Sequence, residues 1–103
     1  MSEEMESHEV TCRAKAVIKN NAGIHCRPTA VIVKEARRFD AQITIESEDA
    51  GSADPTSAIE LLSLGLDKGA HVDLEATGPD AESAVTKLAE LLETEFDFPP
   101  RER

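Results

Sequence analysis

The sequence is poor in aromatic residues, since its 103 residues contain no Trp or Tyr and only three Phe. Proteins that bind single-stranded nucleic acid stack bases on aromatic side chains, so this shortage argues against such a function. Positive charge is also scarce, because 11 Lys and Arg stand against 21 Asp and Glu and give a formal net charge of −10. A chain this acidic is not expected to bind DNA, RNA or an anionic membrane in general.

Cysteine and long apolar runs are scarce too. Cys12 and Cys26 lack the spacing of a metal-binding knuckle, and nothing indicates a disulfide scaffold, so we expect both to be reduced. No apolar run approaches the roughly 20 residues that span a membrane. The first residues are acidic where a signal peptide would be basic. We therefore expect a cytosolic protein without membrane insertion.

The length and the periodicity of the chain predict one domain. Residues 10–96 are expected to form it, with an acidic N-terminal extension over 1–9 and a frayed tail over 97–103. Alternating apolar and polar residues predict strands over 10–20, 41–46 and 71–76. Another strand is only weakly indicated in the acidic turn region 46–55.

Three helices are predicted between and after these strands. The first begins near Pro28 and ends near Phe39, and a short second helix follows Ser57. The third covers residues 81–92 after an N-cap signal at Asp80. The order predicts an α+β fold: an open-faced sandwich with a four-stranded antiparallel sheet covered on one face by three helices (βαββαβα).

Residues 23–30 combine a histidine, an arginine and a proline at the predicted start of the first helix. Helix starts carry unpaired N–H groups and the positive end of the peptide dipole, so an anion formed on His25 would be stabilised there. Arg27 adds a permanent cation, and Pro28 suits a first turn because it lacks an N–H. A loop histidine that only hydrogen-bonds the backbone is the alternative for an isolated His25.

Positive charge gathers around this histidine. Residues 20–38 have a net charge of +3 within a chain of −10, and their cations are Arg27, Lys34, Arg37 and Arg38. A local positive face on an acidic protein can steer an acidic partner. The alternative is that these residues are the solvated side of an amphipathic helix.

The chain resembles the HPr family, the histidine phosphocarriers of the bacterial phosphoenolpyruvate-dependent phosphotransferase system. The resemblance covers roughly residues 10–95 and rests on Gly-Ile-His-Cys-Arg-Pro at 23–28, on Ser57 and on Ser-Leu-Gly-Leu-Asp-Lys-Gly at 63–69. It implies that His25 accepts a phosphoryl group from enzyme I and passes it to an enzyme IIA domain, with Arg27 stabilising the phosphate. It implies a monomeric carrier rather than an enzyme that turns over alone, and no metal or other cofactor.

Two further sites follow from the same resemblance. Ser57 matches the position that a dedicated HPr kinase/phosphorylase modifies in some members, although Ser57 and Glu60 also form a capping box that explains the serine structurally. The partner-docking residues would be on the first two helices: Lys34, Arg37, Ala58, Ile59 and Leu61. Burial in the core is the alternative for the apolar ones.

Two other classes of function remain open at this point. One is a regulatory module that binds an anion or small molecule at the same helix start without covalent transfer. The other is a structural adaptor that acts through its apolar second helix. Both would leave His25 unphosphorylated.

Overall fold

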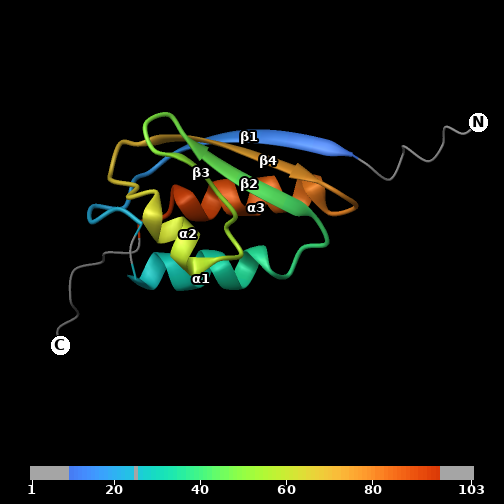
Figure 1. Cartoon of the computed structure of the whole chain (residues 1–103), viewed down its shortest axis with the longest axis horizontal. Helices are drawn as coiled ribbons and strands as arrows, with labels where there is room; N and C mark the ends of the chain where they lie inside the picture. Colours follow the sequence, from blue (N-terminus) through green and yellow to red (C-terminus); the bar gives the residue numbers. More distant parts are fainter. Residues whose placement is uncertain (1–9, 25, 96–103) are drawn as a thin grey trace, which may run out of the picture.

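The computed structural model describes residues 10–24 and 26–95, which form an antiparallel sheet with helices on one face (Figure 1). The elements are β1 (Thr11–Val17), α1 (Cys26–Ala36), β2 (Gln42–Ser47), β3 (Gly51–Ala53), α2 (Ala58–Ser63), β4 (His71–Thr77) and α3 (Ala81–Leu92). The strands lie in the order β1-β4-β2-β3. The predicted α+β open-faced sandwich is confirmed. The expected extension over 1–9 and tail over 97–103 lie outside the described residues.

The strand registers place the apolar side chains on one face. Leu74 in the central strand β4 pairs with Ala14 of β1 and with Ile45 of β2. Because side chains alternate across a strand, the even-numbered residues of β1 and β4 and the odd-numbered residues of β2 face the helices. Ile32 of α1 and Leu88 of α3 are fully buried against that face. The opposite face of the sheet stays open.

The first helix differs from its predicted bounds at both ends. It begins at Cys26, two residues before Pro28, so the proline is the third helical residue, where its missing N–H would have had no intrahelical partner. It ends at Ala36, three residues before Phe39. There the backbone changes to shorter turns, in which the N–H of Arg38 donates to the carbonyl of Glu35. Phe39 still packs against the core from this turn.

The two predicted helix caps are correct in position but not in every contact. Ser57 is the N-cap of α2, and its Oγ accepts the N–H of Glu60 at 3.3 Å. The Glu60 carboxylate does not complete a capping box, because it accepts the N–H of Asp54 at 2.8 Å. Asp80 precedes α3 without a side-chain cap, and its carboxylate accepts the N–H of Asp40 at 2.7 Å. Glu60 therefore ties α2 to the segment before it, and Asp80 ties the β4–α3 connection to the α1–β2 connection.

The weakly indicated strand exists as the three-residue β3, which pairs with the end of β2 through Ile45 and Ala53. Within residues 10–24 and 26–95, no helix is both long enough and apolar enough to cross a membrane.

Candidate functional site

Two connections meet at the end of the molecule where α1 begins. The β1–α1 connection lies against the α2–β4 connection, as the left of Figure 1 shows. The N–H of Gly69 donates to the carbonyl of Ile18 at 2.7 Å, and the N–H of Ile24 donates to the carbonyl of Leu66 at 2.8 Å. The backbone that leads to residue 25 is therefore fixed by a segment more than 40 residues away. His25 itself lies outside the described residues.

The turn before residue 25 depends on a glycine. Gly23 has a φ of +76°, in the left-handed region, and a Cβ at this position would overlap the carbonyl oxygen of Leu66. The side-chain amide of Asn20 donates to the carbonyl of Gly23 at 2.8 Å, and the carbonyl of Asn20 accepts the N–H of Gly23 at 2.9 Å. Asn20 is completely buried. Sequence reasoning missed this residue, although asparagine near glycine is a turn signal.

The helix start provides an environment for an anion. Because α1 begins at Cys26, the amides of Cys26 and Arg27 belong to its first turn and have no intrahelical acceptor. Cys26 and Arg27 are exposed, whereas Pro28 and Thr29 are buried. The positive end of the helix dipole and the Arg27 guanidinium thus lie next to residue 25 in the chain. This arrangement favours a negative charge at that position.

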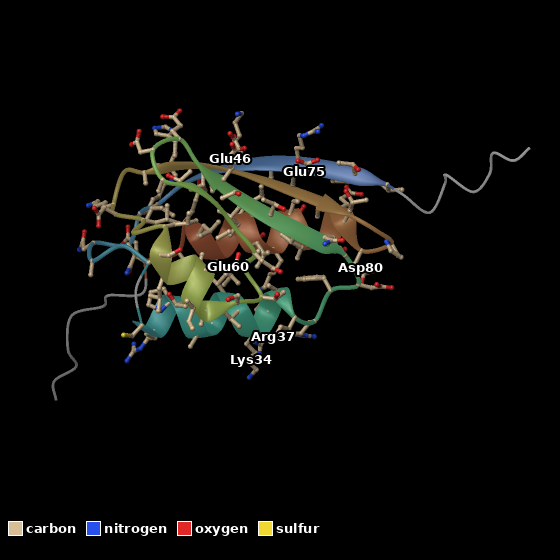
Figure 2. The ribbon with its side chains drawn as sticks, in the orientation of Figure 1. Lys34, Arg37, Glu46, Glu60, Glu75 and Asp80 are labelled. Carbon is tan, nitrogen blue, oxygen red and sulfur yellow. The ribbon has the colours of Figure 1, made fainter. Side chains whose placement is uncertain are left out.

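The other predicted cations line the outer side of α1. Lys34 and Arg37 project away from the sheet (Figure 2). The Nε of Arg37 donates to the carbonyl of Thr56 at 3.0 Å, which ties the end of α1 to the segment before α2. Arg38 instead lies 3.4 Å from the carboxylate of its neighbour Glu35, so its charge is partly offset.

The predicted docking residues of α2 divide into exposed and buried ones. Ala58 is exposed, and Ile59 is 80% exposed. Leu61 has no exposed surface, so the prediction that it is a docking residue is wrong. An α-helix turns every third or fourth side chain to the same face, and in this six-residue helix Leu61 is the one turned inward. Leu62, which is 43% exposed, shares the outer side with Ile59 three residues before it.

Ser57 combines a helix cap with an acidic setting. Its hydroxyl oxygen accepts the N–H of Glu60, and the residue is half-buried. Two acidic residues flank it in the chain: Asp54 lies in the connection before α2, and Glu60, in the first turn of α2, accepts the N–H of Asp54. A phosphoryl group on Ser57 would meet favourable helix amides and two like charges.

Comparison with known proteins identifies the family. The family model "PTS HPr component phosphorylation site" matches residues 12–94. The chain belongs to the PTS HPr family. The phosphocarrier protein HPr of Vibrio cholerae is 46% identical over 71 residues, covering 69% of this chain and 82% of that protein. The phosphocarrier protein NPr of Escherichia coli is 32% identical over 88 residues, covering 85% and 98%.

A solved structure agrees with this family. HPr from Bacillus anthracis superposes with a TM-score of 0.77 at 30% identity and covers 82% of this chain and 99% of that one. Membership of the HPr family supports a phosphocarrier function in the phosphotransferase system. Such relatives carry phosphoryl groups without acting as catalysts.

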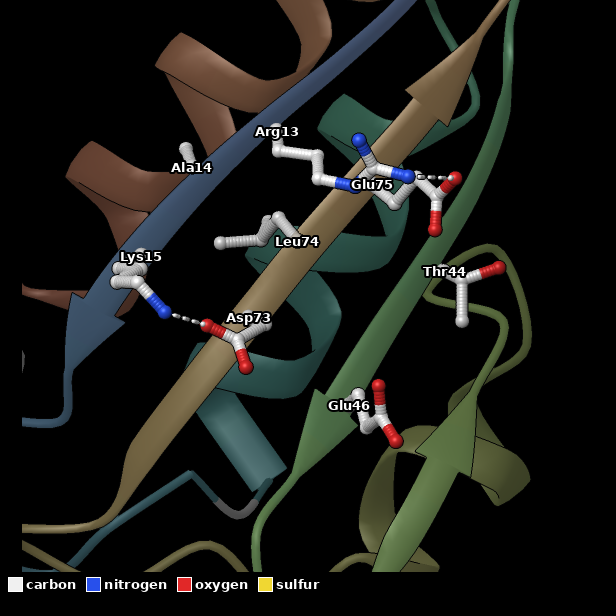
Figure 3. Close-up of a pocket in the computed structure, with 8 residues that line it drawn as sticks. All are labelled: Arg13, Ala14, Lys15, Thr44, Glu46, Asp73, Leu74 and Glu75. Carbon is white, nitrogen blue, oxygen red and sulfur yellow. Dashed lines mark hydrogen bonds and ion pairs between the residues drawn. The ribbon is translucent and has the colours of Figure 1, made fainter.

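The open face of the sheet holds a hollow of about 360 Å³, and none of the predicted site residues lines it (Figure 3). Cross-strand ion pairs line it: Lys15 with Asp73 at 2.8 Å and Arg13 with Glu75 at 3.3 Å. The hydrogen bond and the charge of Asp73 raise the pKa of Lys15 above its usual value. Among the described residues no group of three or more His, Cys, Asp or Glu is placed to hold a metal ion.

Proposed function

We propose that this HPr-family chain carries a phosphoryl group on His25 from phospho-enzyme I to an enzyme IIA domain. The supporting observation is that α1 starts immediately after His25, with Arg27 exposed in its first turn. A ring nitrogen of neutral His25 attacks the phosphorus, the nitrogen–phosphorus bond forms, and the bond from phosphorus to enzyme I breaks. The reverse exchange at enzyme IIA returns the free imidazole.

The helix start favours this exchange for an electrostatic reason. Next to an arginine and the positive end of α1, the uncharged imidazole is preferred over imidazolium, and a phosphorylated ring is preferred over both. Transfer needs the reacting groups to be positioned and the charge to be stabilised, which the partner's active site would complete. No metal enters the proposal.

Partner docking is assigned to the outer sides of α1 and α2. Lys34 and Arg37 would attract acidic partners, and Ala58, Ile59 and Leu62 would supply the apolar contact. Leu61 is left out because it is buried. A carrier exchanging phosphoryl groups with these partners would act in the cytoplasm.

Phosphotransfer with labelled phosphoenolpyruvate and enzyme I tests the central proposal. We expect an acid-labile, alkali-stable adduct on the wild-type chain and none on His25→Ala. Saturable, reversible binding of a phosphorylated ligand without any adduct would instead favour the non-covalent module.

We assign Ser57 a regulatory role that is separable from the relay. Phosphorylation by an HPr kinase/phosphorylase would place a dianion beside Asp54 and Glu60, next to the proposed docking surface. Incubation with such a kinase and ATP should label the wild-type chain and not Ser57→Ala. Ser57→Ala should still accept phosphate from enzyme I, and a label that persists in Ser57→Ala would remove Ser57 from the proposal.

A further inference from the structure

The peptide group between Gly23 and Ile24 is held at both ends. Its carbonyl accepts from the buried amide of Asn20 at 2.8 Å, and its N–H donates to the carbonyl of Leu66 at 2.8 Å. Gly23 and Ile24 are both buried. A peptide plane with both polar groups bonded in the interior has a fixed orientation. This plane is the last one before the peptide that joins Ile24 to His25.

We propose that Asn20 is a positioning residue for phosphoryl transfer, acting through the Gly23–Ile24 peptide on the placement of His25. The inference rests on the proposed function of His25 as the phosphoryl acceptor. Asn20 has no exposed surface, so it acts through the backbone and not by contact with a partner.

Loss of the Asn20 amide would release one end of this peptide. The carbonyl of Gly23 would lose its side-chain donor in the interior, and an unpaired buried carbonyl turns toward water where the backbone permits it. Glycine permits it, because the absence of a Cβ leaves both dihedral angles free to change. The rotation would displace the following residues while the bond from Ile24 to Leu66 is strained or lost.

The effect should fall on the transfer step and not on docking. The proposed docking residues are exposed on α1 and α2, whereas Asn20 is buried within the β1–α1 connection. A misplacement of a reacting group by about 1 Å can cost about 100-fold in rate. We therefore expect Asn20→Ala to lower kcat for acceptance from phospho-enzyme I by about 10- to 100-fold, with KM within about twofold.

The experiment measures kcat and KM of wild type, Asn20→Ala and two controls at a temperature where circular dichroism shows all of them folded. Val85→Ala removes buried volume from α3, outside both connections in the chain, and lowers stability. Asn21→Ala removes the exposed bond from Lys68 that joins the same two connections. Both controls should keep kcat within about twofold, as expected for sites outside the transfer geometry. Hydrogen exchange of the Ile24 amide should become faster in Asn20→Ala alone.

The possible results separate the inference from the proposed function. An unchanged kcat in folded Asn20→Ala, a rise in KM alone, or an equal loss of kcat in Val85→Ala would overturn the positioning role. If Asn20→Ala does not fold, Asn20→Ser leaves a shorter donor in the same cavity and should show the same change with a smaller loss; a wild-type kcat there also overturns the role. If enzyme I labels His25→Ala as well as it labels the wild-type chain, the proposed function is refuted, and the inference with it.

Discussion

Thr29 and Asn20 are both buried polar residues close to His25 in the chain, but only the side chain of Asn20 makes a hydrogen bond. The amide of Asn20 donates to Gly23, whereas the hydroxyl of Thr29 is the one buried side-chain oxygen or nitrogen among the described residues without a hydrogen-bond partner. A buried hydroxyl that leaves water without gaining a partner is unfavourable. The buried amide of Asn20 therefore stabilises its turn, whereas burying the Thr29 hydroxyl lowers the stability of the fold.

Replacing Thr29 by valine should stabilise the fold. Thr29→Val keeps the shape and has a similar helix propensity, so removing the unpaired hydroxyl should raise the free energy of unfolding by about 1 to 2 kcal/mol. Urea unfolding measures this change in the free energy of unfolding. Thr86→Val, at an exposed position of α3, is the control and should change the value by less than about 0.5 kcal/mol. A loss of stability in Thr29→Val would mean that the hydroxyl has a favourable contact after all.

The helix α2 is exposed on one side and buried on the other. Ile59 is 80% exposed and Leu61 is completely buried, although only one residue separates them. The inner side anchors the helix to the core, and the outer side is free for a partner.

Two alanine substitutions should separate these sides. Leu61→Ala should lower the free energy of unfolding by about 2 to 5 kcal/mol because it leaves a cavity. Ile59→Ala should change it by less than about 0.5 kcal/mol and instead raise KM for phospho-enzyme I. Denaturant unfolding and transfer kinetics on both variants measure the two effects. Equal effects on stability would contradict this division of α2.

The sequence predicted the elements better than the contacts that end them. The strong periodicity of α3 and β4 reflects burial of one face, which a local pattern records. The role of Asp80 depends on Asp40, 40 residues away, which it meets only in the folded chain, and Glu60 bonds the backbone of Asp54 in place of that of Ser57. The role of Asn20 was missed because it depends on such contacts, whereas burial had been left open as the alternative for Leu61. The family motif identified the candidate site, but its supporting loop lies more than 40 residues away.

The pairing of β1 with β4 should respond to alkaline pH through Lys15 and Asp73. Asp73 raises the pKa of Lys15 in the folded chain above the ordinary value of 10.5. Protonated Lys15 therefore favours the folded state; this contribution is complete below pH 10.5 and disappears as the pH rises through the raised folded pKa. The pair is exposed, so the effect should be small.

A double-mutant cycle measures this contribution. Lys15→Met, Asp73→Asn and the double variant should show a favourable coupling at pH 8 that vanishes above the folded pKa of Lys15. The chain has no tyrosine, so no phenol titrates over the same range. A coupling that persists in strong alkali would show that the two side chains interact by packing and not by charge.

For the whole molecule, the distribution of charge matters more than its total. The net charge is −10, yet α1 exposes Arg27 in its first turn and presents Lys34 and Arg37 on the side away from the sheet. An acidic partner would be repelled by most of the surface and attracted to this one side. Electrostatics would thus select the orientation in which the start of α1 faces the partner.

If this holds, the association rate with phospho-enzyme I depends on where a charge lies and not on the net charge of the chain. Lys34→Glu and Lys15→Glu change the net charge equally, but Lys34 lies on α1 and Lys15 on the open face of the sheet. Lys34→Glu should lower the association rate with phospho-enzyme I several-fold at low salt, and the difference should shrink near 1 M salt, where the screening length is about 3 Å. Lys15→Glu should have a much smaller effect. Stopped-flow transfer over a range of salt concentrations measures both rates, and equal losses in the two variants would show that net charge alone controls the encounter.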